Sequence, residues 1–231
     1  MTLIFLALVF LFFTKNTCWA QIETKWVGGP MSLPEFHQHA HFNRLEKMEE
    51  MLNNGQDIHA HETEDGRTAL LISARKCHIS GVKLLLSRGA DVEERDLMSR
   101  TPLIEAAANC NVEMLTILIL AGAKVQSIDE FGHTPLMAAA HIGHLAGVQY
   151  LIENGADADV SSKSEPGKPA RTASEWAREA GHLKVAEYLE GPASRNEAAI
   201  PPLPTKRPEF KPTPTKRLDE IENDDNDMKE L

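Results

Sequence analysis

The stretch TPLMAAAHIGHLAGVQYLIENGAD, residues 134–157, decides the fold of this 231-residue chain. Thr134 can cap a helix with its hydroxyl group, and Pro135 suits the first helical position because an N–H group is not needed there. Gly155 closes the stretch, and glycine readily adopts the left-handed conformation that ends a helix. Gly143 separates a short Ala-rich segment from a longer apolar one. The stretch therefore predicts two consecutive helices.

The same pattern recurs every 33 residues, which is typical of a repeat architecture. The recurring positions are Thr68, Thr101 and Thr134; Leu70, Leu103 and Leu136; Ala74, Ala107 and Ala140; Leu85, Leu118 and Leu151; and Gly89, Gly122 and Gly155. A further unit starts at Thr172, and the residues around Phe36 and Met48 fit a degenerate unit at the other end. End units are expected to be atypical because their outer faces meet water.

The pattern resembles the ankyrin repeat. The matching motifs are Thr134-Pro135-Leu136, Ala138-Ala139, Gly143-His144 and Gly155-Ala156-Asp157. The resemblance implies an all-α solenoid of about four to five helix-turn-helix units with β-turn fingers, and a role in protein–protein binding. In that family a histidine commonly follows Thr-Pro-Leu and ties neighbouring units together. Here Leu71, Ile104, Met137 and Glu175 stand in its place, so we expect stacking to depend more on apolar burial.

The composition changes at both ends of the repeats. The apolar run from Leu3 to Phe13 is shorter than the roughly 20 residues that span a membrane, and it fits a secretory signal. We predict cleavage after Ala20 and export to the periplasm or beyond, with an uncleaved membrane anchor as the alternative. The predicted segments are a signal peptide (1–20), a linker (21–31), an ankyrin-repeat domain (32–190) and a tail (191–231), with repeats at about 32–62, 63–95, 96–128, 129–161 and 162–190.

The tail is rich in proline and charge. Seven of the thirteen prolines lie beyond Gly191, and the motif Pro-Thr-Lys-Arg occurs at 204–207 and again at 214–217. Such a segment buries too little apolar surface to offset its ordering entropy, so the sequence predicts a disordered tail. It serves either as an extended spacer or as a polyproline-type docking strip.

The charge and the motifs exclude several classes of function. The formal net charge of −10 argues against nucleic acid as the main partner, since phosphate binding needs Lys and Arg. The sequence contains no phosphate-binding glycine loop, no Gly-x-Ser-x-Gly motif and no Cys-x-x-Cys pair. We therefore expect no catalysis and no cofactor.

The histidines at 37, 39 and 41, with His59 and His61 downstream, suggest a rival function, because alternate histidines on a strand can hold a metal. The repeat pattern places them in a helix, where His39 points about 200° away from His37. We therefore expect an exposed histidine-rich cap and no metal site. A metal-buffering protein of the envelope is kept as the alternative function.

Cys77 and Cys110 occupy equivalent places in adjacent repeats. Export favours a disulfide, but stacked helices lie about 8–10 Å apart, whereas bridged Cα atoms are usually within about 6.8 Å. We therefore expect the two cysteines to stay unbridged.

A binding surface is expected beside the capping threonines. The residues that precede them, Arg67, Arg100, His133 and Arg171, should form an exposed row on the finger side of the concave face, with ordinary solvated side chains as the alternative interpretation. Exposed apolar residues beside that row indicate a protein partner with acidic groups, held by a scaffold, inhibitor, protector or immunity-type binder. The predicted contact residues are Arg67, Arg75, Leu97, Met98, Arg100, Phe131, His133, His141, Ile142 and Arg171.

Overall fold

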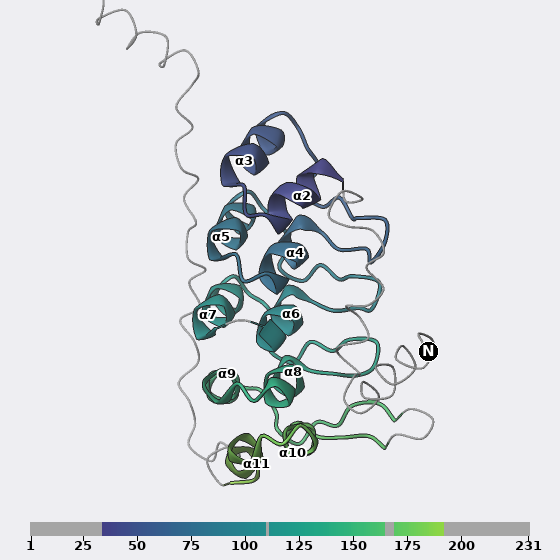
Figure 1. The fold of residues 1–231 in the computed structure, drawn as a ribbon, viewed down its shortest axis with the longest axis vertical. Coiled ribbons are helices and arrows are strands. Elements are labelled where there is room, and N and C mark those ends of the chain that lie inside the picture. Colours follow the sequence, from purple (N-terminus) through teal and green to yellow (C-terminus); the bar gives the residue numbers. More distant parts are fainter. Residues whose placement is uncertain (1–33, 110, 165–168, 192–231) are drawn as a thin grey trace, which may run out of the picture. The chain divides into compact units, whose positions relative to one another are not determined.

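A computed structural model describes residues 34–109, 111–164 and 169–191, and ten helices lie in these ranges (Figure 1). They form five successive helix-turn-helix pairs. The pairs are α2 (Glu35–His41) with α3 (Leu45–Asn53), α4 (Ala69–Arg75) with α5 (Ile79–Ser87), α6 (Pro102–Asn109) with α7 (Val112–Leu120), α8 (Pro135–Ile142) with α9 (Leu145–Glu153), and α10 (Ala173–Glu179) with α11 (Leu183–Glu190). The described ranges hold no strand beyond an isolated bridge between Ser161 and Thr172. The predicted all-α solenoid is confirmed.

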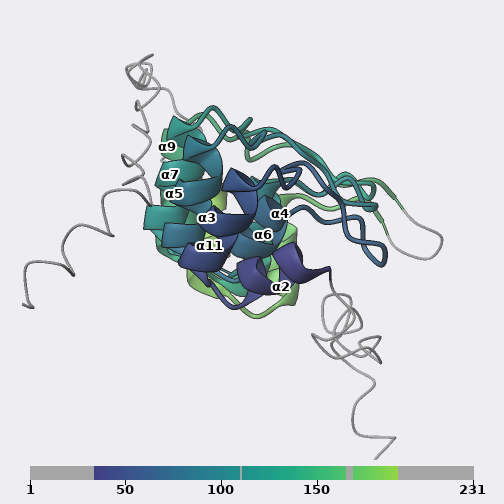
Figure 2. The same ribbon diagram turned by 90° about the horizontal axis from the view of Figure 1, so that it is seen from above.

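The helix pairs stack in two layers. The first helices of the pairs pack on one another in the order α2, α4, α6, α8 and α10, and the second helices form the other layer. The segments between pairs project together to one side of the helices (Figure 2). We call them fingers 1 to 4, with residues 54–67, 88–100, 121–133 and 154–171. Finger 4 includes the four residues that the structure leaves undescribed.

Local sequence explains where the helices begin and end. The Thr68 hydroxyl caps α4, Thr134 caps α8 and Thr172 caps α10, each by accepting a hydrogen bond from a backbone N–H three residues ahead. Gly89 (φ 93°) and Gly155 (φ 88°) follow the second helices in the left-handed conformation that glycine adopts without strain. These caps were predicted from the repeat pattern and are confirmed.

Apolar burial holds the stack together. Leu118 is 0% exposed and Leu136 is 1% exposed, as their recurrence predicts. Leu71 and Ile104, which stand where the family commonly has histidine, are also fully buried. A histidine tie between repeats exists elsewhere, because His78 Nε2 donates a hydrogen bond to the carbonyl oxygen of His41 at 2.9 Å.

The prediction that Cys77 stays unbridged is wrong, because Cys77 is disulfide-bonded. The reasoning used the spacing of stacked helices, but Cys77 lies in the turn between α4 and α5 with a φ of 58°. From this turn its Sγ comes within 3.3 Å of the carbonyl oxygen of Asn109, at the end of α6 in the next repeat. Cys110, the other cysteine of the predicted pair, lies outside the described residues.

The predictions for the signal peptide, the linker and the tail also fall outside the described residues and stay predictions. Among the helices that are described, none has the length and apolar character needed to cross a membrane.

Candidate functional site

Fingers 2 and 3 are each folded back on themselves by hydrogen bonds around an aspartate, and Glu62 in finger 1 and Ser162 in finger 4 make the equivalent backbone hydrogen bond. In finger 2, the Asp96 N–H donates to the carbonyl oxygen of Arg100 at 3.2 Å. The Asp96 carboxylate accepts from the backbone N–H groups of Met98 and Arg100, both at 2.9 Å. Asp129 plays the same part in finger 3, with His133 in place of Arg100. The aspartates therefore fix the tips of these two fingers.

Neighbouring fingers are joined by one backbone hydrogen bond at the same repeat position. Leu97 N donates to Asp65 O at 3.0 Å, and Glu130 N donates to Met98 O at 2.9 Å. Lys163 N donates to the carbonyl oxygen of Phe131 at 2.8 Å. The four fingers are thus held in register, and their surface is preorganised.

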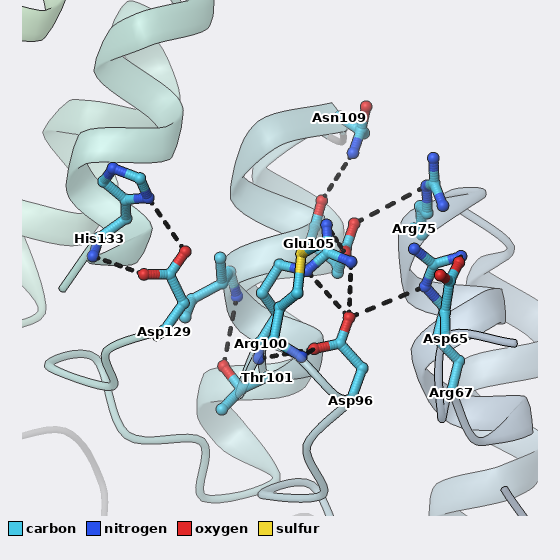
Figure 3. A network of polar contacts seen from close by, with 12 residues as sticks. Asp65, Arg67, Arg75, Asp96, Arg100, Thr101, Glu105, Asn109, Asp129 and His133 are labelled. Atoms are coloured by element: carbon cyan, nitrogen blue, oxygen red, sulfur yellow. Dashed lines mark hydrogen bonds and ion pairs between the residues drawn. The ribbon is translucent and has the colours of Figure 1, made fainter. Parts of the chain in front are cut away.

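The prediction of an exposed arginine row is wrong for Arg100. Its side chain is 5% exposed, and its guanidinium group contacts Asp96 at 2.7 Å and Glu105 at 3.0 Å (Figure 3). Asp96 and Glu105 are themselves buried. Burial alone would lower the pKa of Arg100, but Glu105 and Asp96 more than offset this effect and raise it. Arg100 therefore neutralises buried carboxylates instead of facing a partner.

Arg67 is equally buried, with a side chain that is 2% exposed. One of its terminal nitrogens lies 2.6 Å from Asp65 and 3.9 Å from Glu62, while its Nε lies 3.9 Å from Asp96. Burial lowers the pKa of Arg67 because the charged form loses its hydration. Figure 3 shows Arg67 and Arg100 on either side of Asp96. The prediction of a partner with acidic groups rested on an exposed cationic row, and Arg67 and Arg100 do not supply one.

The second half of the predicted row has a different setting. His133 Nδ1 lies 3.0 Å from Asp129 Oδ2, and its ring meets Trp176 edge-on at 5.2 Å. Arg171 lies over the face of Trp176 at 5.2 Å, and His141 meets the same ring at 5.5 Å. Trp176 is 8% exposed, so these predicted contact residues cluster around one buried indole ring.

Other predicted contact residues lie at the surface. Leu97 is 71% exposed at the tip of finger 2, and Met98 and Phe131 are half-buried at equivalent positions of fingers 2 and 3. Ile142 is 48% exposed at the end of α8, away from the fingers. Arg75 is half-buried, with its Nε 3.9 Å from Glu105.

The exposed charges on the fingers are mainly acidic. The exposed acids are Asp57, Glu64, Asp91, Glu130, Asp157 and Asp159, and the exposed Lys and Arg residues are Arg95, Lys124 and Lys163. Because Arg67 and Arg100 are buried in ion pairs, they do not offset these carboxylates at the surface. Within the described residues, the fingers therefore present the opposite charge to the one predicted.

The predicted histidine-rich cap is helical but not exposed. His37 is 1% exposed and His39 is 7% exposed on α2. His37 Nε2 donates to the carbonyl oxygen of Ala60 at 2.9 Å, so this histidine ties α2 to finger 1. Burial lowers the pKa of His37. No group of three or more His, Cys, Asp or Glu residues suited to a metal ion occurs in the part of the chain that the structure describes.

Sequence reasoning missed Glu105, Trp176 and Ile128. Glu105 and Trp176 both stand four residues after a capping threonine, where Ala138 and Ile72 are apolar and buried. A charged residue at a repeat position that is otherwise apolar was the available signal for Glu105. Ile128, which is 44% exposed on finger 3, was detectable as an isolated apolar residue in a polar turn.

Comparison with known proteins supports the same architecture. A family model described as ankyrin repeats (3 copies) matches residues 36–129 and again residues 103–196, which together make up more than half of the chain. No curated protein matches the sequence. The residues that match the family model include all five helix pairs, from residue 36 in α2 to the end of α11, and the fingers between them. This chain therefore belongs to the ankyrin-repeat family.

Proposed function

We propose that this protein binds another protein through fingers 2 and 3, outside the cytoplasm and without catalysing a reaction. Ankyrin-repeat domains are typically non-catalytic interaction modules. The binding surface is inferred from the exposed apolar side chains of fingers 2 and 3. The location outside the cytoplasm is inferred from the disulfide at Cys77 and the predicted signal peptide.

The observation that carries the proposal is the exposure of apolar side chains on two adjacent fingers. Leu97 is 71% exposed and Ile128 is 44% exposed, although turns are normally polar. Met98 and Phe131 lie half-buried beside them in the same two fingers. Exposed apolar groups that are rimmed by polar residues mark protein interaction sites, because their burial against a partner removes apolar area from water.

The stiffness of the fingers supports this surface. The hydrogen bond from Glu130 N to Met98 O joins fingers 2 and 3, and the Asp96 and Asp129 carboxylates fix their tips. A partner therefore meets groups that are already ordered, which reduces the entropy lost on binding.

The disulfide at Cys77 supports action outside the cytoplasm, because disulfides persist mainly in oxidising compartments. Together with the predicted signal peptide, it favours a periplasmic or secreted scaffold, inhibitor, protector or immunity-type binder. Metal buffering is not favoured, because His37 and His39 are buried and the described residues, which include His59 and His61, hold no group of three or more His, Cys, Asp or Glu suited to a metal ion.

The test is co-capture of partners by the tagged full-length protein in its native compartment. Substituting both Leu97→Asp and Ile128→Asp should lower the yield of any specific partner by roughly tenfold or more, as loss of interface anchors does. Leu183→Asp is the matched control, because Leu183 is also exposed (57%) but lies on α11, away from the fingers. Equal loss with both variants, or equal capture, would place the binding surface elsewhere.

A further inference from the structure

The finger tips expose one row of equivalent residues, which we call the tip row: Glu64, Leu97, Glu130 and Lys163. Three of these residues follow at intervals of 33, and each of the three donates its backbone N–H to the preceding finger. Leu97 leans over finger 1, since a Cβ atom at Gly66 would lie only 2.8 Å from Leu97 Cγ. The tip row thus places an exposed leucine on finger 2, between fingers 1 and 3, which carry exposed carboxylates.

A segment of the same chain has the matching composition. Residues 204–217, PTKRPEFKPTPTKR, lie outside the described residues and contain five bases, one acid and one phenylalanine. The bases stand on both sides of Phe210, with Lys206 and Arg207 before it and Lys211 immediately after it. The order base, aromatic, base is complementary to the order acid, leucine, acid of Glu64, Leu97 and Glu130, and Lys163 at the end of the tip row lies outside this match.

We propose that residues 204–217 bind the tip row of their own chain, with Phe210 against Leu97 and the flanking bases toward Glu64 and Glu130. The tail then covers the surface assigned to the partner, and a partner must displace it to bind. This inference rests on the proposed function, because it names what regulates that same surface.

The chain is long enough for this contact. Twelve residues, 192–203, separate the end of the described region at Gly191 from the segment, and they span up to about 40 Å when extended. The path crosses the two helix layers, roughly 20–24 Å wide, and then follows a finger to its tip, and the six further residues 204–209 before Phe210 add up to about 20 Å of reach. Within the segment, the five steps from Lys206 to Lys211, on either side of Phe210, would span about 16 Å in a polyproline II conformation. The two steps between stacked repeats from Glu64 to Glu130, at about 8–10 Å each, cover a similar distance.

A tether makes weak contacts sufficient. Exposed ion pairs contribute little individually, and salt screens them. A segment on the same chain, however, meets the tip row at a millimolar effective concentration. A tighter-binding partner can still displace it. Cis binding of this kind regulates access to the fingers without blocking them permanently.

The test is zero-length cross-linking of the full-length protein with a carbodiimide, followed by peptide mass spectrometry. The reagent activates a carboxylate, and a lysine amine in contact with it then forms an amide bond, while the carbodiimide takes up the elements of water. We expect bonds from Lys206, Lys211 and Lys216 to Glu64 and Glu130. Glu46 on α3 is the internal control, because it is exposed but lies away from the fingers.

Phe210→Ala should lower the yield of these cross-links by roughly five- to tenfold, because the lysines remain while the apolar contact is lost. Arg195→Ala removes a base outside the segment and should leave the yield unchanged. Cross-links spread evenly over Glu46 and the finger carboxylates, or unaffected by Phe210→Ala, would overturn the proposal. In a mixture of ¹⁴N and ¹⁵N chains, bonds between chains instead of within one chain would also overturn it.

The cross-linking result does not depend on finding a partner, so it separates this inference from the proposed function. Partner capture that depends on Leu97 but shows no tail cross-links would leave the proposed function standing and sink the inference. If the proposed function and the contact between the tail and the tip row are both correct, Phe210→Ala should increase partner capture, because the substitution releases the tail from the tip row.

Discussion

The two halves of the solenoid fill the same repeat position with different chemistry. Before the second and third pairs of helices, Arg67 and Arg100 are buried among carboxylates, with Glu105 four residues after the capping threonine. Before the last pair, Arg171 lies over Trp176, which stands at the position equivalent to Glu105. The backbone hydrogen bond between neighbouring fingers recurs at the same repeat position in both halves. The fold therefore fixes the backbone position of these arginines. The residue four positions after the capping threonine, Glu105 or Trp176, decides whether the arginine forms a buried ion pair or packs over an aromatic ring.

This difference has energetic consequences, because a buried ion pair and a partly exposed cation–π contact respond differently to truncation. Removal of one partner from a buried pair leaves an unpaired charge in a poorly hydrated site. Removal of the partly exposed Arg171 leaves its acidic neighbour, Glu179, in contact with water, so the loss of stability is smaller. The contrast between the halves can be tested by mutation and by pH.

The largest effect is expected for Arg100→Ala. This change leaves the buried carboxylates of Asp96 and Glu105 without their closest cation, so the free energy of unfolding should fall by about 3–5 kcal/mol. Urea denaturation followed by circular dichroism measures it. Lys124→Ala, on finger 3 and exposed, should change stability by no more than about 0.5 kcal/mol. A loss below about 1 kcal/mol for Arg100→Ala would mean that the pair is hydrated, as a surface salt bridge is.

A smaller effect is expected on acidification, where partly buried histidines contribute with one sign and the buried Glu62 with the other. Burial lowers the pKa of His141 below its ordinary 6.5, and His182 and His133 lower it further, while Glu179 opposes them. The unfolded chain then binds the proton more readily, so the stability contributed by His141 is complete above pH 6.5 and is lost below it. His37 and His41 have lowered pKa values and share this sign.

Glu62, in the half with the buried ion pairs, acts the other way. Burial raises its pKa, with Arg67 opposing, so its contribution is complete below pH 4.5 and is lost as the pH rises through the folded pKa. Urea midpoints at pH 7.5 and 5.5 should show a net loss in acid. The loss should be smaller in His141→Asn and larger in Glu62→Gln. Identical pH dependence in the two variants would mean that neither group is coupled to folding.

The sequence was sufficient for the periodic part of the molecule. Thr134, Leu118 and Gly155 could be placed because a cap, a core residue and a left-handed turn each recur at a fixed interval and depend on local chemistry. The burial of Arg100 could not be predicted in this way, because the period aligns equivalent positions without saying what packs over them. The exposure of Leu97 could be predicted because it lies among polar residues of a turn. The disulfide at Cys77 could not, because it depends on a turn conformation that the spacing of helices does not describe.

The smallest effect is expected for Arg171, which completes the comparison. Its guanidinium group lies over Trp176 and pairs with Glu179, whose side chain is 55% exposed. Arg171→Ala should cost about 1 kcal/mol, the range of a partly exposed cation–π contact, because Glu179 stays in water afterwards. Arg171→Met keeps an apolar chain over the ring and removes only the charge, so it separates packing from the cation–π term. If both variants lose as much stability as Arg100→Ala, measured by the same urea titration, then the two halves do not differ in the way proposed and Arg171 also neutralises a buried charge.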